Sequence, residues 1–170
     1  MSILESNRFQ TLLQTLSSRV SRLERYAASG RWIPFTPIIS GTGWAIGNGA
    51  AVGNYMRHGN TVTFWSRVTF GTTSTFGAGR LALAWPVEAT TSISGRAGVF
   101  NAYAANASTT YLLYVSPLSV TAMELYANKV TVAALATPTY VDLAGVISTI
   151  PFTWAATHRV YVSGTYEVAE

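Results

Sequence analysis

The sequence has no cysteine, which excludes a disulfide scaffold, thiolate metal sites and thiol catalysis. Charge is also scarce, because Lys, Arg, Asp and Glu make up 11% of the residues, against about a quarter in ordinary soluble domains. No apolar run approaches the roughly 18 residues that a membrane-spanning helix needs. A secretory leader is not expected either, since Glu5 and Arg8 interrupt the first apolar stretch. We therefore expect a protein that is made in the cytoplasm and does not insert into a membrane.

Apolar residues, in contrast, make up 49% of the 170 residues, which is enough to bury a sizeable core and excludes a disordered chain. The length fits one globular domain with an appendage. The net charge of +4 is unevenly placed, because residues 1–32 hold five arginines against two glutamates, a net charge of +3. The remaining basic residues are scattered. This pattern does not predict a nucleic-acid-binding protein, which gathers basic side chains in a patch with aromatic residues.

The amino-terminal segment predicts an amphipathic helix. Residues 6–28 contain neither Gly nor Pro, and their apolar residues follow one another in steps of four and three, which is the spacing of a coiled-coil seam. The segment 19–24 resembles the short Arg-to-Glu signature of parallel trimeric coiled coils, in which an arginine meets a carboxylate of the neighbouring helix. The residues expected to form the trimer are Phe9, Leu13, Leu16, Arg19, Val20, Leu23 and Glu24.

An ordinary helix that packs on its own domain is the alternative interpretation. The apolar stripe is narrow, and a helix docked on a core normally has a wider one, so the pattern favours association between chains. Three heptads are too short to be stable as an isolated helix, which also requires association or docking. We expect the helix to end near Ser29, with Gly30 free to adopt a left-handed conformation.

Residues 33–170 have the composition of a β-domain, rich in Thr, Val, Tyr and Gly and without a helical stripe. Residues 61–70 and 158–167 alternate between apolar and polar side chains, as half-buried antiparallel strands do. Residues 57–60 read as a hairpin turn in which Gly59 supplies a positive φ. We expect a mainly β fold, an antiparallel, jelly-roll-like sandwich of two sheets. Further strands are expected at 51–57, 79–85, 96–104, 110–115, 119–126 and 129–134.

Catalytic, metal and cofactor sites are not expected. The β-domain has five acidic residues, and no two of them are close enough in sequence to suggest the pair that a glycosidase needs. His58 lies in the expected turn and His158 opens the last strand, but no nucleophile motif accompanies either one, so we interpret both as surface residues. Three copies of His58 on a threefold axis could hold a metal, although nothing in the sequence favours it.

The surface of the β-domain is expected to be aromatic and nearly uncharged. The chain has five Trp and nine Tyr, and Trp65, Tyr103 and Tyr161 fall on the outward side of expected strands. Aromatic rings of this kind stack on sugars, which predicts a glycan contact. They are equally typical of contacts between subunits, and we favour this second interpretation because a trimer must bury uncharged surface.

Three segments carry a resemblance to a known group of proteins. They are residues 47–64 (GNGAAVGNYMRHGNTVTF), 76–87 (FGAGRLALAWPV) and 151–167 (PFTWAATHRVYVSGTYE). These turns and strands resemble those of virion surface proteins of tailed bacteriophages, of the tail-fibre and minor tail type, and the likeness covers most of 33–170. Such proteins commonly have a Gly-Asp pair before the last strand, where this chain has Thr157 and His158.

The resemblance implies a homotrimeric, non-enzymatic protein of the virion. Residues 1–32 would be the coiled-coil stalk that binds other virion proteins, and residues 33–170 the head domain presented to the host, where its partner would be a cell-wall glycan. The same residues fit a trimeric capsid decoration protein. A polysaccharide depolymerase fits less well, because such enzymes usually contain a long β-helix with internal repeats, and none is visible here.

Overall fold

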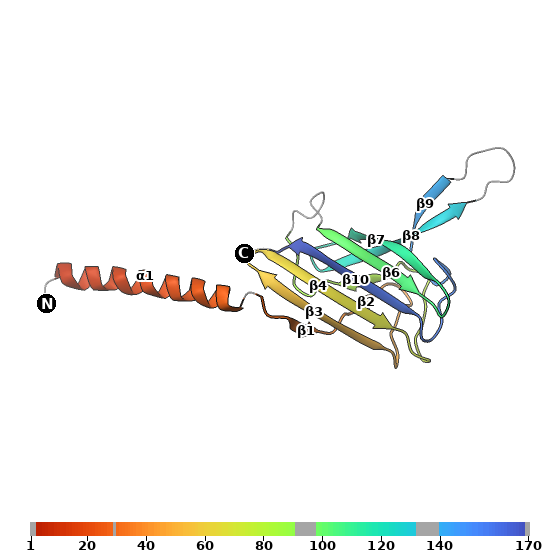
Figure 1. Cartoon of the computed structure of the whole chain (residues 1–170), viewed down its shortest axis with the longest axis horizontal. Coiled ribbons are helices and arrows are strands. Elements are labelled where there is room, and N and C mark those ends of the chain that lie inside the picture. The colour runs from red at the N-terminus through yellow and green to blue at the C-terminus, as the bar shows by residue number, and fades with distance from the viewer. Residues whose placement is uncertain (1–2, 29, 91–97, 132–139, 169–170) are drawn as a thin grey trace.

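A computed structural model describes residues 3–28, 30–90, 98–131 and 140–168, with side chains for 10–22, 30–90, 98–128 and 143–168. The fold is mainly β, with one amino-terminal helix that projects from an antiparallel β-domain (Figure 1). No helix in the described part of the chain is both long and apolar enough to cross a membrane. The elements are α1 (Ile3–Ala28), β1 (Ile33–Phe35), β2 (Ile39–Ser40), β3 (Ala50–His58), β4 (Thr61–Thr69), β5 (Ala82–Ala84), β6 (Val99–Ala105), β7 (Thr110–Pro117), β8 (Ala122–Thr131), β9 (Tyr140–Gly145) and β10 (Arg159–Glu167).

Hydrogen bonds join the strands into one sheet in the order β1-β3-β4-β10-β6-β7-β8-β5-β2, with β9 paired to β8 beyond β5. The two edge strands, β1 and β2, are separated in the chain only by residues 36–38, which can span at most about 14 Å. The sheet must therefore curl until its edges come close together, and it forms a half-barrel. The expected two-sheet, jelly-roll-like sandwich is not shown, because the described strands form one continuous sheet.

The alternation of side chains along the long strands is as predicted. On β4, Val62, Phe64 and Val68 are buried, while Trp65 and Arg67 on the other side are exposed. On β10 the buried positions are Val160, Val162 and Tyr166. Each strand therefore places one face in the core and turns the other toward solvent.

Aromatic rings fill much of the core in two groups. The first consists of Phe64, Trp85, Phe100 and Tyr166, with Trp85 and Tyr166 centroids 4.6 Å apart. The second consists of Trp44, Phe70, Phe76, Phe152 and Trp154. The Trp and Phe residues of the segments 76–87 and 151–167 thus belong to the core and to the side chains packed against it, which explains those motifs as structural.

Two strand glycines allow aromatic rings to approach the backbone closely. A Cβ on Gly53 would come within 2.5 Å of the Phe35 ring, and one on Gly164 within 2.3 Å of the Phe100 ring. In each case the aromatic residue is the direct partner of the glycine on the neighbouring strand. Glycine is therefore required at both positions by the packing.

Several local predictions are confirmed. The helix ends at Ala28, and Gly30 has a φ of 99°. Strands β3 and β4 are joined by the expected turn, in which Gly59 has a φ of 57° and accepts a hydrogen bond from Arg57 Nε at 2.7 Å. The Gly-Asn-Gly turn also has a structural reason, because Asn48 holds the loop at Thr73. Its side-chain Oδ1 accepts hydrogen bonds from the Thr73 amide and hydroxyl, and its backbone amide donates to the Thr73 hydroxyl.

Other strand predictions are wrong in detail. The expected strands at 119–126 and 129–134 are one strand, β8, whose described end is Thr131. The segment 79–85 shortens to β5, and Leu81 just before it donates its amide to the Val146 carbonyl outside the named strands. Strands β1, β2 and β9 were not expected, since the first two are only three and two residues long and all three depend on partners distant in the sequence.

Candidate functional site

The helix seam is the first candidate site. Leu13, Leu16 and Val20 are all exposed, with exposed fractions of 48%, 61% and 45%, and Arg19 beside them is exposed as well. The helix points away from the β-domain, so the described part of the chain does not cover these side chains (Figure 1). The side chains of Phe9, Leu23 and Glu24 lie outside the described residues, and the expected Arg19–Glu24 pairing stays a prediction.

The helix surface beside the seam is polar, and its hydroxyl groups form hydrogen bonds within the helix. Thr15 donates its hydroxyl to the Thr11 carbonyl at 2.8 Å, and Ser18 donates to the Thr15 carbonyl at the same distance. These side chains use their donors within their own helix. The exposed apolar seam is therefore the part of the helix that gains most from a partner.

The second candidate site is the outer face of the sheet, formed by the outward side chains of β3, β4, β10, β6 and β7. We call it the outer face. A single cross-strand row runs over all five strands, through directly opposed residues. In strand order the row is Val52, Arg67, Tyr161, Tyr103 and Leu112. Apolar and aromatic side chains thus make up this row, with one arginine among them.

The structure brings the three expected aromatic residues onto this face. Tyr103 and Tyr161 are direct partners on β6 and β10, and their rings stack with centroids 4.4 Å apart at an angle of 18°. Trp65 lies on β4 opposite Ser163 and is therefore a diagonal neighbour of Tyr161. Trp65 and Tyr103 are each 39% exposed, so both offer contact surface to a partner molecule.

The stacking limits what the two tyrosines can do. Each ring covers one face of the other, so a planar ligand would have no access between them. Each tyrosine retains its other ring face, its ring edge and the phenol hydroxyl, which forms hydrogen bonds with sugars, carboxylates and protein groups alike. Trp65 makes no ring contact among the described residues and has the freer aromatic surface of the three.

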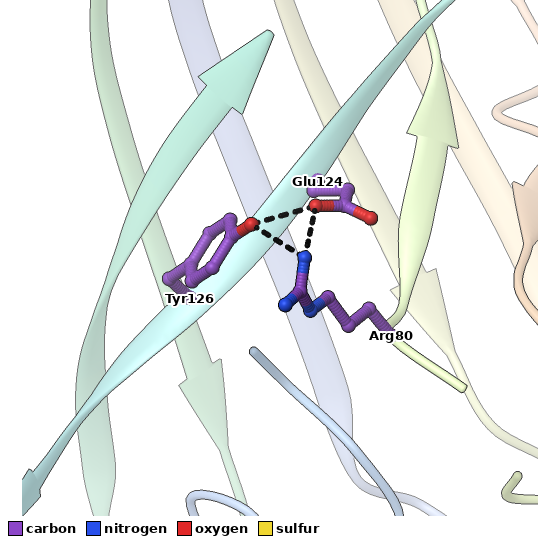
Figure 2. Close-up of polar contacts among 3 residues, drawn as sticks. All are labelled: Arg80, Glu124 and Tyr126. Carbon is purple, nitrogen blue, oxygen red and sulfur yellow. Dashed lines mark hydrogen bonds and ion pairs between the residues drawn. The ribbon is translucent and has the colours of Figure 1, made fainter. Parts of the chain in front are cut away.

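Sequence reasoning missed one polar cluster, which joins Arg80, Glu124 and Tyr126 (Figure 2). The Tyr126 phenol donates to Glu124 Oε2 at 2.7 Å, and Arg80 Nη1 lies 3.3 Å from the same oxygen and 3.0 Å from the phenol oxygen. The hydrogen bond to Glu124, together with burial, raises the pKa of Tyr126 above its ordinary value. The spacing of Glu124 and Tyr126 on an expected strand was the available signal.

This cluster links the segment before β5 to β8. Arg80 lies against Gly145, where a Cβ would meet the arginine side chain at 2.7 Å, and its guanidinium lies 5.4 Å from the centre of the Tyr126 ring. Phenol, carboxylate and guanidinium satisfy one another, and the pKa of the phenol moves away from neutrality. The arrangement therefore suits anchoring the segment before β5 to β8, not proton transfer near neutral pH.

The two histidines differ from each other. His58 is exposed at the end of β3, as expected. His158 is only partly exposed, because its ring packs edge-on against Phe152 with centroids 5.0 Å apart and its Nδ1 accepts a hydrogen bond from the Ala155 amide. Burial lowers the pKa of His158 below its ordinary value. Among the described residues, no three His, Asp or Glu side chains gather as a metal site.

Comparison of the chain with protein-family models, with curated proteins and with solved structures gave no match. The resemblance to phage virion proteins therefore stays an expectation drawn from the sequence motifs.

Proposed function

We propose that the chain is a structural protein of a tailed-phage virion, a homotrimer held by a coiled coil of its amino-terminal helix. In this proposal the helix attaches the protein to the virion, and the β-domain of residues 33–170 mediates attachment to the host surface. The protein acts by binding and carries out no catalysis.

The exposed helix seam carries this proposal. Burying a leucine stabilises a protein by about 1.5–3 kcal/mol. Leu13, Leu16 and Val20 are exposed in the single chain, so association that buries them would be substantially stabilising. A parallel trimer buries all three, and it places the β-domains side by side at one end of the stalk. Three linked copies of one weak site bind a surface far more tightly than a single copy.

The motif resemblance supports the assignment to a virion, and one detail of the structure agrees with it. Thr157 has a φ of 70°, a conformation that favours glycine, and it stands where the phage proteins commonly have glycine. At this position the backbone conformation, not a side-chain contact, thus sets the preference for glycine.

The trimer is tested by placing a charge in the seam. We expect light scattering to give the parent protein three times the 18.2 kDa mass of the chain, and the Leu16→Asp variant the mass of one chain. Ser18→Asp is the matched control, because it adds the same charge to the same helix outside the apolar seam and should leave the trimer intact. A parent protein of 18.2 kDa, or a Leu16→Asp variant with unchanged mass, would show that the helix does not organise the assembly.

The attachment role is tested with labelled virions and with host cells. Label at the tail tip, together with binding to host cell-wall polysaccharide without new reducing ends, supports the proposal. Label on the head and binding to capsids would favour the alternative, a trimeric capsid decoration protein, which the exposed seam and the low-charge face also fit. Release of reducing ends would identify a depolymerase.

A further inference from the structure

The outer face carries two arginines that have no acidic partner in the described part of the chain. Arg67 lies opposite Tyr161, and Arg159 lies two residues before Tyr161 on the same strand, so the two arginines are diagonal neighbours across β4 and β10. Diagonal neighbours on one face are about 7–8 Å apart at the backbone, well within the reach of two arginine side chains. The only ion pair among the described residues is Arg80–Glu124, so neither of these arginines is neutralised by one.

Acidic residues are nearly absent from the same face. The outward positions of the five strands contain a single carboxylate, Glu167, at the opposite end of β10 from Arg159. Seven residues of strand lie between them, so the eight steps from one to the other span about 26 Å. The region around Arg67 and Arg159 is therefore a positively charged area in an otherwise uncharged, aromatic surface, and it is complementary to an anion.

The residues beside the arginines are of types that can contact a sugar. Trp65 lies two positions from Arg67 on the same face of β4, about 7 Å along the strand. Ser163 and Asn54 are its direct partners on the neighbouring strands and supply neutral hydrogen-bonding groups. A sugar ring lying over the indole would thus bring an acidic substituent within reach of a guanidinium.

We propose that the outer face binds an anionic glycan, with a sugar ring on Trp65 and its carboxylate or phosphate groups on Arg67 and Arg159. This inference rests on the proposed attachment function and names the class of receptor. It also favours a glycan contact over a subunit contact for the outward aromatic residues, because a second copy of the chain would have to bring carboxylates to these arginines.

Two observations disfavour a nucleic acid as the occupant. Single-stranded nucleic acids stack successive bases on free aromatic faces, whereas Tyr103 and Tyr161 each have one face covered by the other ring. A nucleic acid also needs a track of cations along its backbone, and this face has only one pair. The proposal therefore concerns a polymer in which acidic groups are attached to sugars.

The test measures binding of the full-length protein to polygalacturonate, to its fully methyl-esterified form and to poly(glycerol phosphate). The ester keeps the sugar rings and removes the charge, while poly(glycerol phosphate) provides phosphate without sugar rings. We expect polygalacturonate to bind, the ester to bind at least about tenfold more weakly, and added salt to weaken the charged complex. Binding of poly(glycerol phosphate) as tight as that of polygalacturonate would assign phosphate as the anion and overturn the stacking role of Trp65.

Variants test whether the outer face, and not another part of the molecule, binds the polymer. Arg67→Gln combined with Arg159→Gln should weaken polygalacturonate binding about tenfold or more, and Trp65→Ala should weaken it as well. Arg31→Gln removes an exposed charge outside the sheet and should leave affinity unchanged. Unchanged affinity of the double variant, equal binding of the ester, or tighter binding of a thymidine oligonucleotide would each overturn the proposal.

Two further measurements separate the possible failures. If Arg67→Glu reduces the mass measured by light scattering, the face is an interface between copies of the chain and the glycan proposal is wrong. If the double variant still adsorbs to host cells like the parent protein, the anionic-glycan inference fails while the attachment function stands. If the parent protein does not adsorb to host cells at all, the attachment function fails.

Discussion

The phenol of Tyr166 connects the last strand to the segment after β5, and its removal is a sharp test of the packing. The hydroxyl donates to the Val87 carbonyl at 2.6 Å and accepts from the Val87 amide at 3.1 Å, while the ring is 2% exposed. A Tyr166→Phe variant loses two hydrogen bonds of about 0.5–1.5 kcal/mol each, so we expect the free energy of unfolding to fall by about 1–3 kcal/mol.

Urea denaturation followed by tryptophan fluorescence measures this loss, at a fixed protein concentration because the chain is proposed to be a trimer. Tyr161→Phe is the matched control, since it removes a phenol from the outer face, where the described contact is a ring stack. We expect this control to change the free energy of unfolding by less than about 0.5 kcal/mol. Equal effects of the two substitutions would refute the importance of the buried hydroxyl.

The pKa of Tyr166 predicts that the free energy of unfolding depends on pH. Burial raises the pKa of Tyr166 well above its usual value, so the folded protein retains a proton that the unfolded chain releases near pH 10. The stability that this raised pKa contributes is fully present below pH 10 and is lost as the pH rises above it, by at most about 1.4 kcal/mol per pH unit. The difference in stability between the parent protein and Tyr166→Phe should shrink in this range. A constant difference from pH 8 to 11 would contradict the buried phenol.

Two other substitutions test the backbone. Thr157→Gly should stabilise the protein by up to about 1 kcal/mol, because a left-handed residue costs about 1–2 kcal/mol and the added chain entropy of glycine takes back part of the gain; a lower melting temperature would contradict this. Gly53→Ala should destabilise by about 1–3 kcal/mol, because its Cβ meets the Phe35 ring at 2.5 Å, and an unchanged urea midpoint would show that the ring moves aside freely.

The elements that could be predicted have local signals. The heptad spacing of residues 9–27 gives a helix, and the alternation in β4 and β10 identifies their buried faces, because each pattern follows from the repeat of its own backbone. The outward positions of Trp65, Tyr103 and Tyr161 follow from the same alternation. Their exposure could therefore be expected before their neighbours were known.

What could not be predicted depends on pairing between distant segments. Strands β1 and β2 carry too few residues for a pattern and are defined by partners 22 and 44 positions away, as in the pairs Ile33–Tyr55 and Ile39–Leu83. The Arg80–Glu124–Tyr126 cluster likewise joins residues more than 40 positions apart. The charge of the outer face was missed for the same reason, since Arg67 and Arg159 are neighbours only through the β4–β10 register.

The sequence by itself determined a charge-poor, cysteine-free β-domain with an apolar-seamed helix, because composition and periodicity are properties of the chain alone. Only the tertiary structure decided that the sheet is single and curled, that Tyr103 and Tyr161 stack on each other, and that two arginines share one face with Trp65. The physical reason is that register places residues from remote parts of the chain opposite one another, and a shift by one residue would turn each of these side chains to the other face.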